Sequence, residues 1–166
     1  MINIGQRHLT ISTCGLVPKI YEFADLETGV NLAVSLHAPN NEIRDKIMKI
    51  NHAYKIEEVM KALDYYIEKT NRRVTIEYIM LDGINDSKEC ALELASLVKD
   101  KLMYVNIIPY NETSHFELKR SNDFKIKNFY DILKMNNVNV TIRKEMGGNL
   151  SAACGQLRAN AERSGE

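Results

Sequence analysis

The chain has 166 residues, enough to bury a substantial core in one domain, and its 22 basic and 22 acidic side chains cancel. Balanced charge excludes a global field that would point to a nucleic-acid or membrane partner. The three cysteines, Cys14, Cys90 and Cys154, are far apart and odd in number, which argues against a disulfide framework and indicates a reducing compartment. Because the sequence shows no signal peptide and no long apolar span, we expect a soluble, cytoplasmic protein.

Five runs rich in β-forming residues alternate with helical patterns along the chain. Strands are expected at residues 8–13, 31–36, 73–81, 103–109 and 138–143. Short helices are expected at 17–24 and 41–48, and apolar stripes at helical spacing predict longer helices around 56–67, 91–98 and 126–133. Asp86-Ser87-Lys88-Glu89 resembles a capping box with Asp86 at the cap, and Ser121 or Asn122 begins the last helix. This alternation predicts an α/β fold with parallel strands.

Each predicted strand has one apolar phase and one largely polar phase. Helices should cover the apolar phase, which includes Leu9 and Ile11 in the first strand. The polar phase includes Ser35, Glu77 and Arg143. Burying Glu77 and Arg143 without partners would cost several kcal/mol, so we expect a concave face that holds a polar ligand or ordered water. An open sheet with one solvated face, or a core with paired polar groups, fits the same pattern.

Polar side chains also mark the points where the predicted strands end. Ser35 and His37 alternate onto the polar phase at the end of the second strand, and Ser12 occupies the equivalent end of the first. Asn111 follows the fourth strand through Pro109. Ligands of parallel α/β folds bind at the carboxyl ends of strands, which makes these residues candidates for a binding site. A capped turn around a hydrogen-bonded His37, and an ordinary turn at Asn111, are the alternatives.

Cys154 lies just beyond the last predicted strand, among small residues and glycine. A thiol at such a position is placed for chemistry, although no neighbouring histidine or helix terminus lowers its pKa, so an inert thiol is the alternative. Cys14 and Cys90 are interpreted as small apolar residues, and no Cys/His spacing predicts a metal site. The turn signals in residues 82–86 are interpreted as structural.

Five segments then occur in an order that is specific in combination: residues 12–18, 35–40, 78–86, 106–111 and 152–157. Together they resemble the radical SAM methyltransferases that modify adenine in RNA, the RlmN/Cfr family. The wording of residues 37–40 is similar to the RlmN branch, which methylates carbon 2 of adenine in 23S rRNA and in certain tRNAs. The resemblance covers about residues 4–160.

The resemblance implies a partial (β/α) barrel of the radical SAM type, with about five mostly parallel strands and outer helices. Residues 1–166 would form a single domain, the C-terminal part of the core, without the accessory domain and the cluster-binding segment. It also implies that Ser12, Ser35, Leu36, His37 and Asn111 bind S-adenosylmethionine, and that Cys154 accepts a methyl group and carries it to the adenine. We expect the first strand to leave an open sheet edge.

The resemblance further implies a [4Fe–4S] cluster in the full-length enzyme, whose ligands are not in this chain, and an electron donor to that cluster. The RNA partners would be 23S rRNA and tRNA, with no membrane partner, and the full-length enzyme would be monomeric. The fragment alone is therefore expected to be inactive. A non-enzymatic RNA- or partner-binding remnant, or an unrelated barrel fragment that binds a small polar metabolite, are the alternatives.

Overall fold

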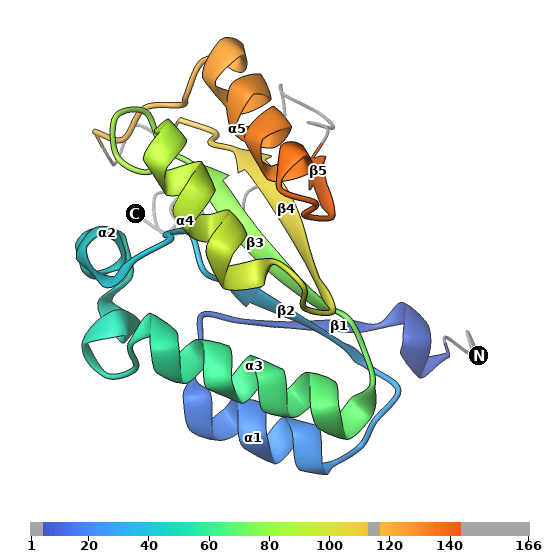
Figure 1. Ribbon diagram of the computed structural model, residues 1–166. Helices are drawn as coiled ribbons and strands as arrows, with labels where there is room; N and C mark the ends of the chain where they lie inside the picture. The colour runs from blue at the N-terminus through green and yellow to red at the C-terminus, as the bar shows by residue number, and fades with distance from the viewer. Residues whose placement is uncertain (1–4, 113–116, 144–166) are drawn as a thin grey trace, which may run out of the picture.

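A computed structural model of the chain describes residues 5–112 and 117–143, so Cys154 lies outside the described residues. In this part of the chain five strands form one parallel sheet in sequential order (Figure 1). The strands are β1 (Thr10–Thr13), β2 (Asn31–Ser35), β3 (Val74–Met80), β4 (Met103–Pro109) and β5 (Val140–Ile142). The α-helices are α1 (Val17–Asp25), α2 (Asn41–Ile47), α3 (Ile56–Thr70), α4 (Lys88–Val98) and α5 (Asp123–Met135). A 3₁₀ turn, η1 (Gln6–His8), precedes β1, and a second, η2 (Lys49–His52), lies between α2 and α3.

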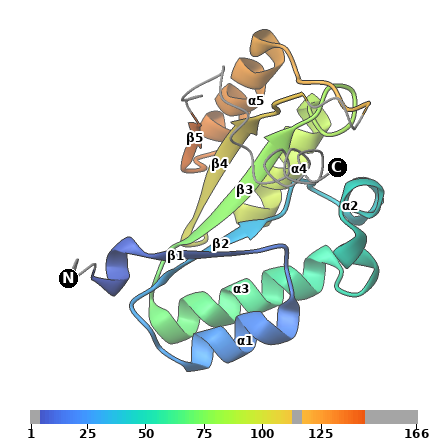
Figure 2. The ribbon, with the colours of Figure 1, turned by 180° about the vertical axis from the view of Figure 1, so that it is seen from behind.

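The longer helices lie on one face of this sheet. Figures 1 and 2, seen from opposite sides, show α1, α3, α4 and α5 on the same side of the strands. Helix α1 packs against α3, and α4 packs against α5. The core lies between these helices and the apolar side chains of the strands, with Val34, Ile76 and Val105 fully buried. The predicted α/β architecture with parallel strands and outer helices is therefore confirmed.

The two phases of the central strands differ as the sequence predicted. Along β3 and β4 buried and half-buried residues alternate strictly. Ile76 and Tyr78 are buried beneath the helices, whereas Glu77 is half-buried on the opposite face. There the Glu77 carboxylate accepts a hydrogen bond from the Asn106 amide at 2.9 Å. Of the interpretations left open, paired polar groups therefore describe Glu77.

The first strand corrects one prediction. Leu9 and Ile11, which we expected the helices to cover, are 43% and 48% exposed. The reason is position, because β1 is the edge strand of the described sheet and pairs only with β2 there. Within the described residues, β1 thus has the edge position that we expected.

Two helix starts were resolved by the structure. Ser87, rather than the predicted Asp86, caps α4 by accepting a hydrogen bond from the Cys90 N–H at 3.2 Å. Asn122, one of the two predicted candidates, caps α5 by accepting from the Lys125 N–H.

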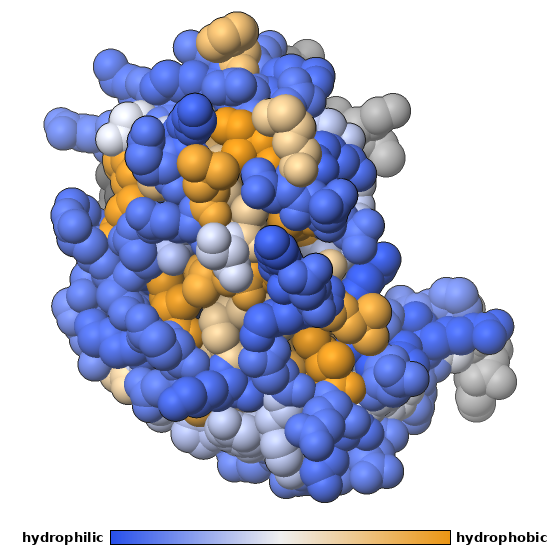
Figure 3. All heavy atoms as spheres, viewed as in Figure 1, coloured by the Kyte–Doolittle hydropathy of each residue, from blue (hydrophilic) through white to orange (hydrophobic). Residues whose placement is uncertain are grey.

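Figure 3 shows that hydrophilic side chains cover most of the helical face, with apolar groups between them. No described helix has the length and apolar character needed to cross a membrane.

Candidate functional site

The carboxyl edge of the sheet brings together most of the predicted site residues. Ser12 is exposed in β1, Ser35 is the half-buried last residue of β2, and half-buried His37 follows it by two positions. Asn111 is exposed two residues beyond β4. Leu36 differs from these, because its side chain is fully buried in the core and only its backbone can face a ligand. The predicted role of Cys154 concerns a residue outside the described part of the chain.

His37 is held in an unusual conformation at this edge. Its φ is 58°, in the left-handed region that non-glycine residues rarely occupy. Its backbone N–H donates to the Glu77 carbonyl at 3.2 Å, and its Nδ1 accepts a hydrogen bond from the Ile79 N–H, also at 3.2 Å. Burial of the imidazole lowers the pKa of His37 to about 4, against an opposing contribution from the Glu77 carbonyl. The ring is therefore neutral near pH 7.

Asn85 is fully buried behind His37 and connects it to the end of β3. Its amide nitrogen donates to the carbonyls of His37 and Ile79 at 2.8 and 2.7 Å. Its amide oxygen accepts from the Leu81 N–H at 2.8 Å, and its backbone carbonyl accepts from the Tyr78 hydroxyl at 2.7 Å. The predicted structural role of residues 82–86 is confirmed, but the sequence did not reveal that this turn reaches His37.

Asp86, next to Asn85, ties the same turn to α5. Its carboxylate accepts hydrogen bonds from the Gly83 N–H, the Ser121 hydroxyl and the Lys125 ammonium, at 3.1, 2.8 and 3.1 Å. Lys125 also contacts Asp82 at 2.8 Å, and this hydrogen bond lowers the pKa of Asp82 and raises that of Lys125. The loop beyond β3 is therefore fixed at both ends.

Arg44, which the sequence analysis did not single out, joins the ends of β1 and β2. Although it lies in the short helix α2, it is fully buried. Its guanidinium donates to the carbonyls of Cys14 and Leu36 at 2.6 and 3.2 Å, and to the Asn51 amide oxygen at 3.0 Å. Its charged form is thus surrounded by neutral oxygens. No signal in the sequence separates this arginine from an exposed one, because its acceptors come from three different segments.

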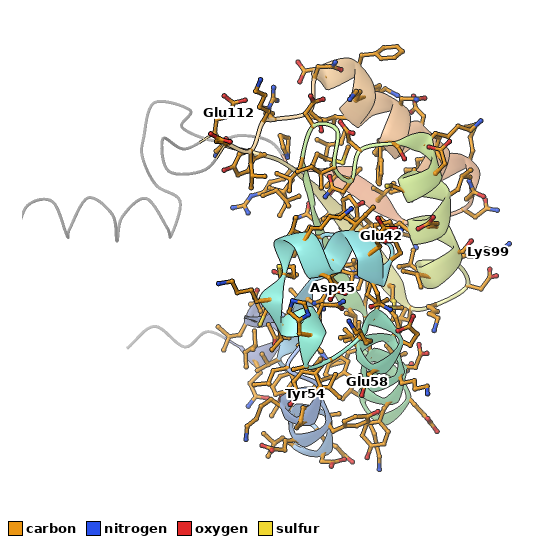
Figure 4. All side chains as sticks on the ribbon, turned by 90° about the vertical axis from the view of Figure 1, so that its left-hand side faces the viewer. Glu42, Asp45, Tyr54, Glu58, Lys99 and Glu112 are labelled. Carbon is orange, nitrogen blue, oxygen red and sulfur yellow. The ribbon has the colours of Figure 1, made fainter. Side chains whose placement is uncertain are left out.

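A polar cluster of Asp45, Asn51 and Lys55 lies beside Arg44 and holds one of its hydrogen-bond acceptors in place. Asn51 donates to the Asp45 carboxylate at 2.7 Å, and Lys55 donates to the same carboxylate at 3.1 Å. These contacts, the Asn51 hydrogen bond first, lower the pKa of Asp45. Figure 4 labels Asp45 with Tyr54 and Glu58, which lie in the turn from η2 into α3 and in the first turn of α3. This cluster orients Asn51 toward the guanidinium.

The loop after β1 depends on Gly15. Its φ is +101°, and a Cβ built there would lie 3.0 Å from Arg44 Nη2 and 3.2 Å from a Val59 methyl carbon. The Thr13 hydroxyl accepts from the Gly15 and Leu16 N–H groups at 3.2 and 3.4 Å. The absence of a side chain at Gly15 therefore leaves room for Arg44 to approach the backbone of this loop. Cys14 is exposed, contrary to its interpretation as an apolar filler, whereas Cys90 is buried in α4 as expected.

A groove of about 390 Å³ lies at the carboxyl ends of β4 and β5, beside the start of α5. It is lined by Pro109, Arg120, Asp123, Ile126, Lys127, Ile142 and Arg143. Three cationic side chains and one carboxylate face this groove, and two of the cations are ion-paired, Arg120 with Asp123 at 3.1 Å and Lys127 with Asp131. The lining keeps a small excess of positive charge, which suits an anionic ligand or partner.

The described residues do not fit an iron–sulfur cluster. Such clusters need several cysteine thiolates close together, and in residues 5–112 and 117–143 no group of three His, Cys, Asp or Glu side chains could hold a metal ion. Cys14 is exposed on a loop and Cys90 is buried in α4. At the carboxyl edge of the sheet, Ser35, His37 and Asn111 offer hydroxyl, imidazole and amide groups to a polar ligand.

Comparison with known proteins identifies the family. The model of the radical SAM superfamily matches residues 1–95. The chain belongs to the radical SAM superfamily. Its curated relatives include proteins named probable dual-specificity RNA methyltransferase RlmN from Caldanaerobacter subterraneus subsp. tengcongensis, 54% identical over 157 residues, and from Enterococcus faecalis, 59% identical over 159 residues. These matches cover 95% and 94% of this radical SAM chain, but 46% and 44% of the relatives. They confirm the resemblance to the RlmN branch.

Solved structures agree with this assignment. A radical SAM methyltransferase from Sphaerobacter thermophilus superposes with a TM-score of 0.89 at 43% identity, over 92% of this chain and 45% of that one. A domain of the pyruvate-formate lyase-activating enzyme from Bacteroides vulgatus shares the fold alone, with a TM-score of 0.65 at 15% identity, over 81% of this chain and 80% of that one. The chain thus spans less than half the length of the methyltransferases that it matches. Full-length members of the superfamily use S-adenosylmethionine and a [4Fe–4S] cluster.

Proposed function

We propose that this chain is the S-adenosylmethionine-binding and methyl-carrying part of an RNA adenine-C2 methyltransferase, the C-terminal part of a radical SAM core. The observation that carries the proposal is identity of 54% to 59% with proteins named dual-specificity RNA methyltransferase, along nearly the whole chain. Because the chain spans less than half of those proteins, the activity of the whole enzyme, its 23S rRNA and tRNA substrates, its electron donor, its monomeric state and its cytoplasmic location are parts of the same proposal.

The proposed ligand-binding residues are Ser12, Ser35, Leu36, His37 and Asn111. The structure supports them by position, because half-buried Ser35 and His37 lie at the carboxyl end of β2, and exposed Ser12 and Asn111 lie at or beyond the same ends of β1 and β4. Leu36 would contribute only through its backbone carbonyl, which already accepts from Arg44 and has a second lone pair, because its side chain is buried and its N–H donates to the Glu77 carbonyl at 3.1 Å. When bound, S-adenosylmethionine supplies the methyl group and, with the cluster, the radical. We assign the described residues no part in cluster chemistry.

The proposed role of Cys154 rests on the sequence resemblance. Its thiolate would attack the methyl carbon of S-adenosylmethionine, forming a sulfur–carbon bond as the bond from that carbon to the sulfonium breaks. The thiol proton passes to solvent, and S-adenosylhomocysteine leaves. A thiolate suits this displacement because sulfur is a strong nucleophile near neutral pH.

Two measurements test the proposal. Calorimetry should detect S-adenosylmethionine binding to the purified chain, and Ser35→Val should weaken it. In a longer protein that contains this chain and a reconstituted cluster, isotopically labelled methyl should appear on Cys154, and Cys154→Ala should abolish the label. Cys14→Ser is the matched control and should retain it. Labelling that persists in Cys154→Ala would refute the carrier role, and failure of the longer protein to bind S-adenosylmethionine would refute the proposed function.

The groove beside α5 supports RNA as the partner, because Arg120, Lys127 and Arg143 could contact phosphates. RNA binding through this groove should weaken as salt concentration rises. RNA binding by a longer, cluster-loaded protein that neither binds nor consumes S-adenosylmethionine would favour a non-enzymatic RNA-binding remnant instead.

A further inference from the structure

We propose that Asn85 is a positioning residue of this site, and that Asn85 and Ile79 together hold His37 as the neutral tautomer whose proton is on Nε2. His37 would then present an N–H donor to an acceptor atom of S-adenosylmethionine. The identity of the ligand rests on the proposed function, whereas the tautomer and the role of Asn85 rest on the structure of the free chain.

The tautomer follows from the contact at Nδ1. The Ile79 N–H lies 3.2 Å from this nitrogen, and a backbone N–H can only donate. Nδ1 must therefore carry a lone pair. A neutral imidazole has one ring proton, so that proton is on Nε2. Burial of the ring has the largest effect on its pKa and, together with the charge of Arg44, it disfavours the doubly protonated cation against the opposing effect of the Glu77 carbonyl.

The orientation of the ring follows from the backbone. A non-glycine residue in the left-handed region is strained by about 1–2 kcal/mol, so the φ of 58° at His37 needs support from its surroundings. The Glu77 carbonyl accepts from the His37 N–H, and the Asn85 amide donates to the His37 carbonyl. The same Asn85 amide donates to the carbonyl of Ile79, whose N–H faces the imidazole. Asn85 thereby fixes the main chain on both sides of the ring contact.

A neutral donor suits the proposed ligand. S-adenosylmethionine carries a sulfonium cation together with acceptor atoms in its carboxylate, hydroxyls and adenine ring. A histidinium in the same site would repel the sulfonium, whereas a neutral Nε2–H donates to an acceptor without adding charge. Asn85 is well suited to hold this state, because a carboxamide donates to two carbonyls and accepts from one N–H without carrying charge itself.

Nitrogen-15 NMR of the free chain at pH 7 tests the tautomer without any ligand. The chain has four histidines, and the ring signals of His37 are those that disappear in His37→Gln. We expect the Nε2 shift of a protonated nitrogen and the Nδ1 shift of an unprotonated one. The reverse pattern, or an even mixture of tautomers, would overturn the inference whatever the chain binds.

Calorimetry with S-adenosylmethionine tests the role of Asn85. Asn85→Asp keeps an oxygen that accepts from the Leu81 N–H, but it replaces the amide donor with a second oxygen facing the carbonyls of His37 and Ile79. Because both hydrogen bonds to those carbonyls are lost, we expect a mixture of His37 tautomers and at least about a 10-fold loss of S-adenosylmethionine affinity. Ser121→Ala is the matched control, because it removes a buried hydrogen bond to Asp86 in the same turn without touching His37. Its affinity should stay within about 2-fold. Equal losses in the two variants would reduce Asn85 to a purely structural role.

Two substitutions of His37 keep the test informative if Asn85→Asp fails to fold. His37→Gln places an amide donor near the position of Nε2, whereas His37→Phe keeps a ring without a donor. We expect His37→Gln to retain affinity within about 5-fold and His37→Phe to lose at least about 10-fold. Equal losses would overturn the donor role. If neither the chain nor the longer protein binds S-adenosylmethionine, the proposed function is contradicted, and the NMR result alone decides the tautomer.

Discussion

Replacing Arg44 with methionine should destabilise the chain and loosen the two loops that it joins. Methionine keeps an unbranched side chain of similar reach but removes every donor. The structure shows which acceptors lose their partners: the carbonyls of Cys14, Leu36 and Tyr54 and the amide oxygen of Asn51. The Arg44 contacts to Leu36 and Asn51 are fully buried, whereas the contacts to Cys14 and Tyr54 are only partly buried, so water can replace those two.

The magnitude follows from these two buried acceptors. Each acceptor left unpaired in the interior costs about 1–3 kcal/mol, so the two together cost about 2–6 kcal/mol. Removing a buried guanidinium also removes its own desolvation penalty, which offsets part of this loss. We therefore expect the free energy of unfolding to fall by about 2–4 kcal/mol. For a domain of this size, such a loss lowers the Tm by roughly 5–15 °C.

Urea denaturation followed by circular dichroism measures this difference. Lys46→Met is the matched control, because Lys46 lies on the same helix and pairs only with exposed Glu42 among the described residues. It should change stability by no more than about 0.5 kcal/mol. Arg44→Lys keeps the charge but has fewer donors, and should fall between the two. If Arg44→Met is as stable as the parent or more stable, the buried acceptors have found other partners and our reasoning is wrong.

Three further predictions concern other parts of the same edge. Native His37 has a pKa of about 4 and an unfolded histidine one near 6.5, so the unfolded chain binds more protons between these values. Stability should therefore fall as pH drops from 6.5 to 4, by at most about 3 kcal/mol, and urea titrations across this range should show a smaller fall in His37→Gln. Gly15→Ala should destabilise by about 2–4 kcal/mol in thermal melts, because it combines a φ of +101° with a 3.0 Å contact, whereas Gly83→Ala, with a φ of +68° and open space, should lose only about 1 kcal/mol; similar losses would show that the contact at Gly15 relaxes freely. Arg143→Glu, in a longer protein that binds RNA, should weaken binding and reduce its salt slope by about one unit or more in fluorescence anisotropy, and an unchanged slope would place the RNA elsewhere.

The elements themselves were largely predictable from the sequence. β4 has the predicted bounds, and α3 and α4 begin and end close to their apolar stripes, because periodicity is a local property that burial then reinforces. β1 and β5 are shorter than predicted, at Thr10–Thr13 and Val140–Ile142. Strand ends depend on pairing partners, which local pattern does not specify.

The predictions failed where distant segments decide the outcome. Asp86 and Ser87 are equally good caps for α4 by residue type, and Asp86 is drawn away by Ser121 and Lys125, which follow it by 35 and 39 positions. From the sequence, Arg44 would be expected to be an exposed residue of a short helix. In the structure it is buried, and its hydrogen-bond acceptors come from the loops after two strands and from η2. Ser35 and His37 could be found from the sequence because they alternate with apolar residues such as Leu36. Arg44 and Asn85, which orient the backbone around them, are not part of any such alternation.

Three residues whose contacts the sequence pattern did not predict, Arg44, Asn85 and Asp86, act in the same physical way. Arg44 and Asn85 donate to main-chain carbonyls, and Asp86 accepts from the main-chain N–H of Gly83. Hydrogen bonds to the backbone fix the path of a loop regardless of its side chains, so they shape a site without contacting its ligand. Buried polar groups are stable only when these bonds are complete. It follows that loss of any one of them should move the loops beyond β1, β2 or β3 before it disturbs the apolar core beneath.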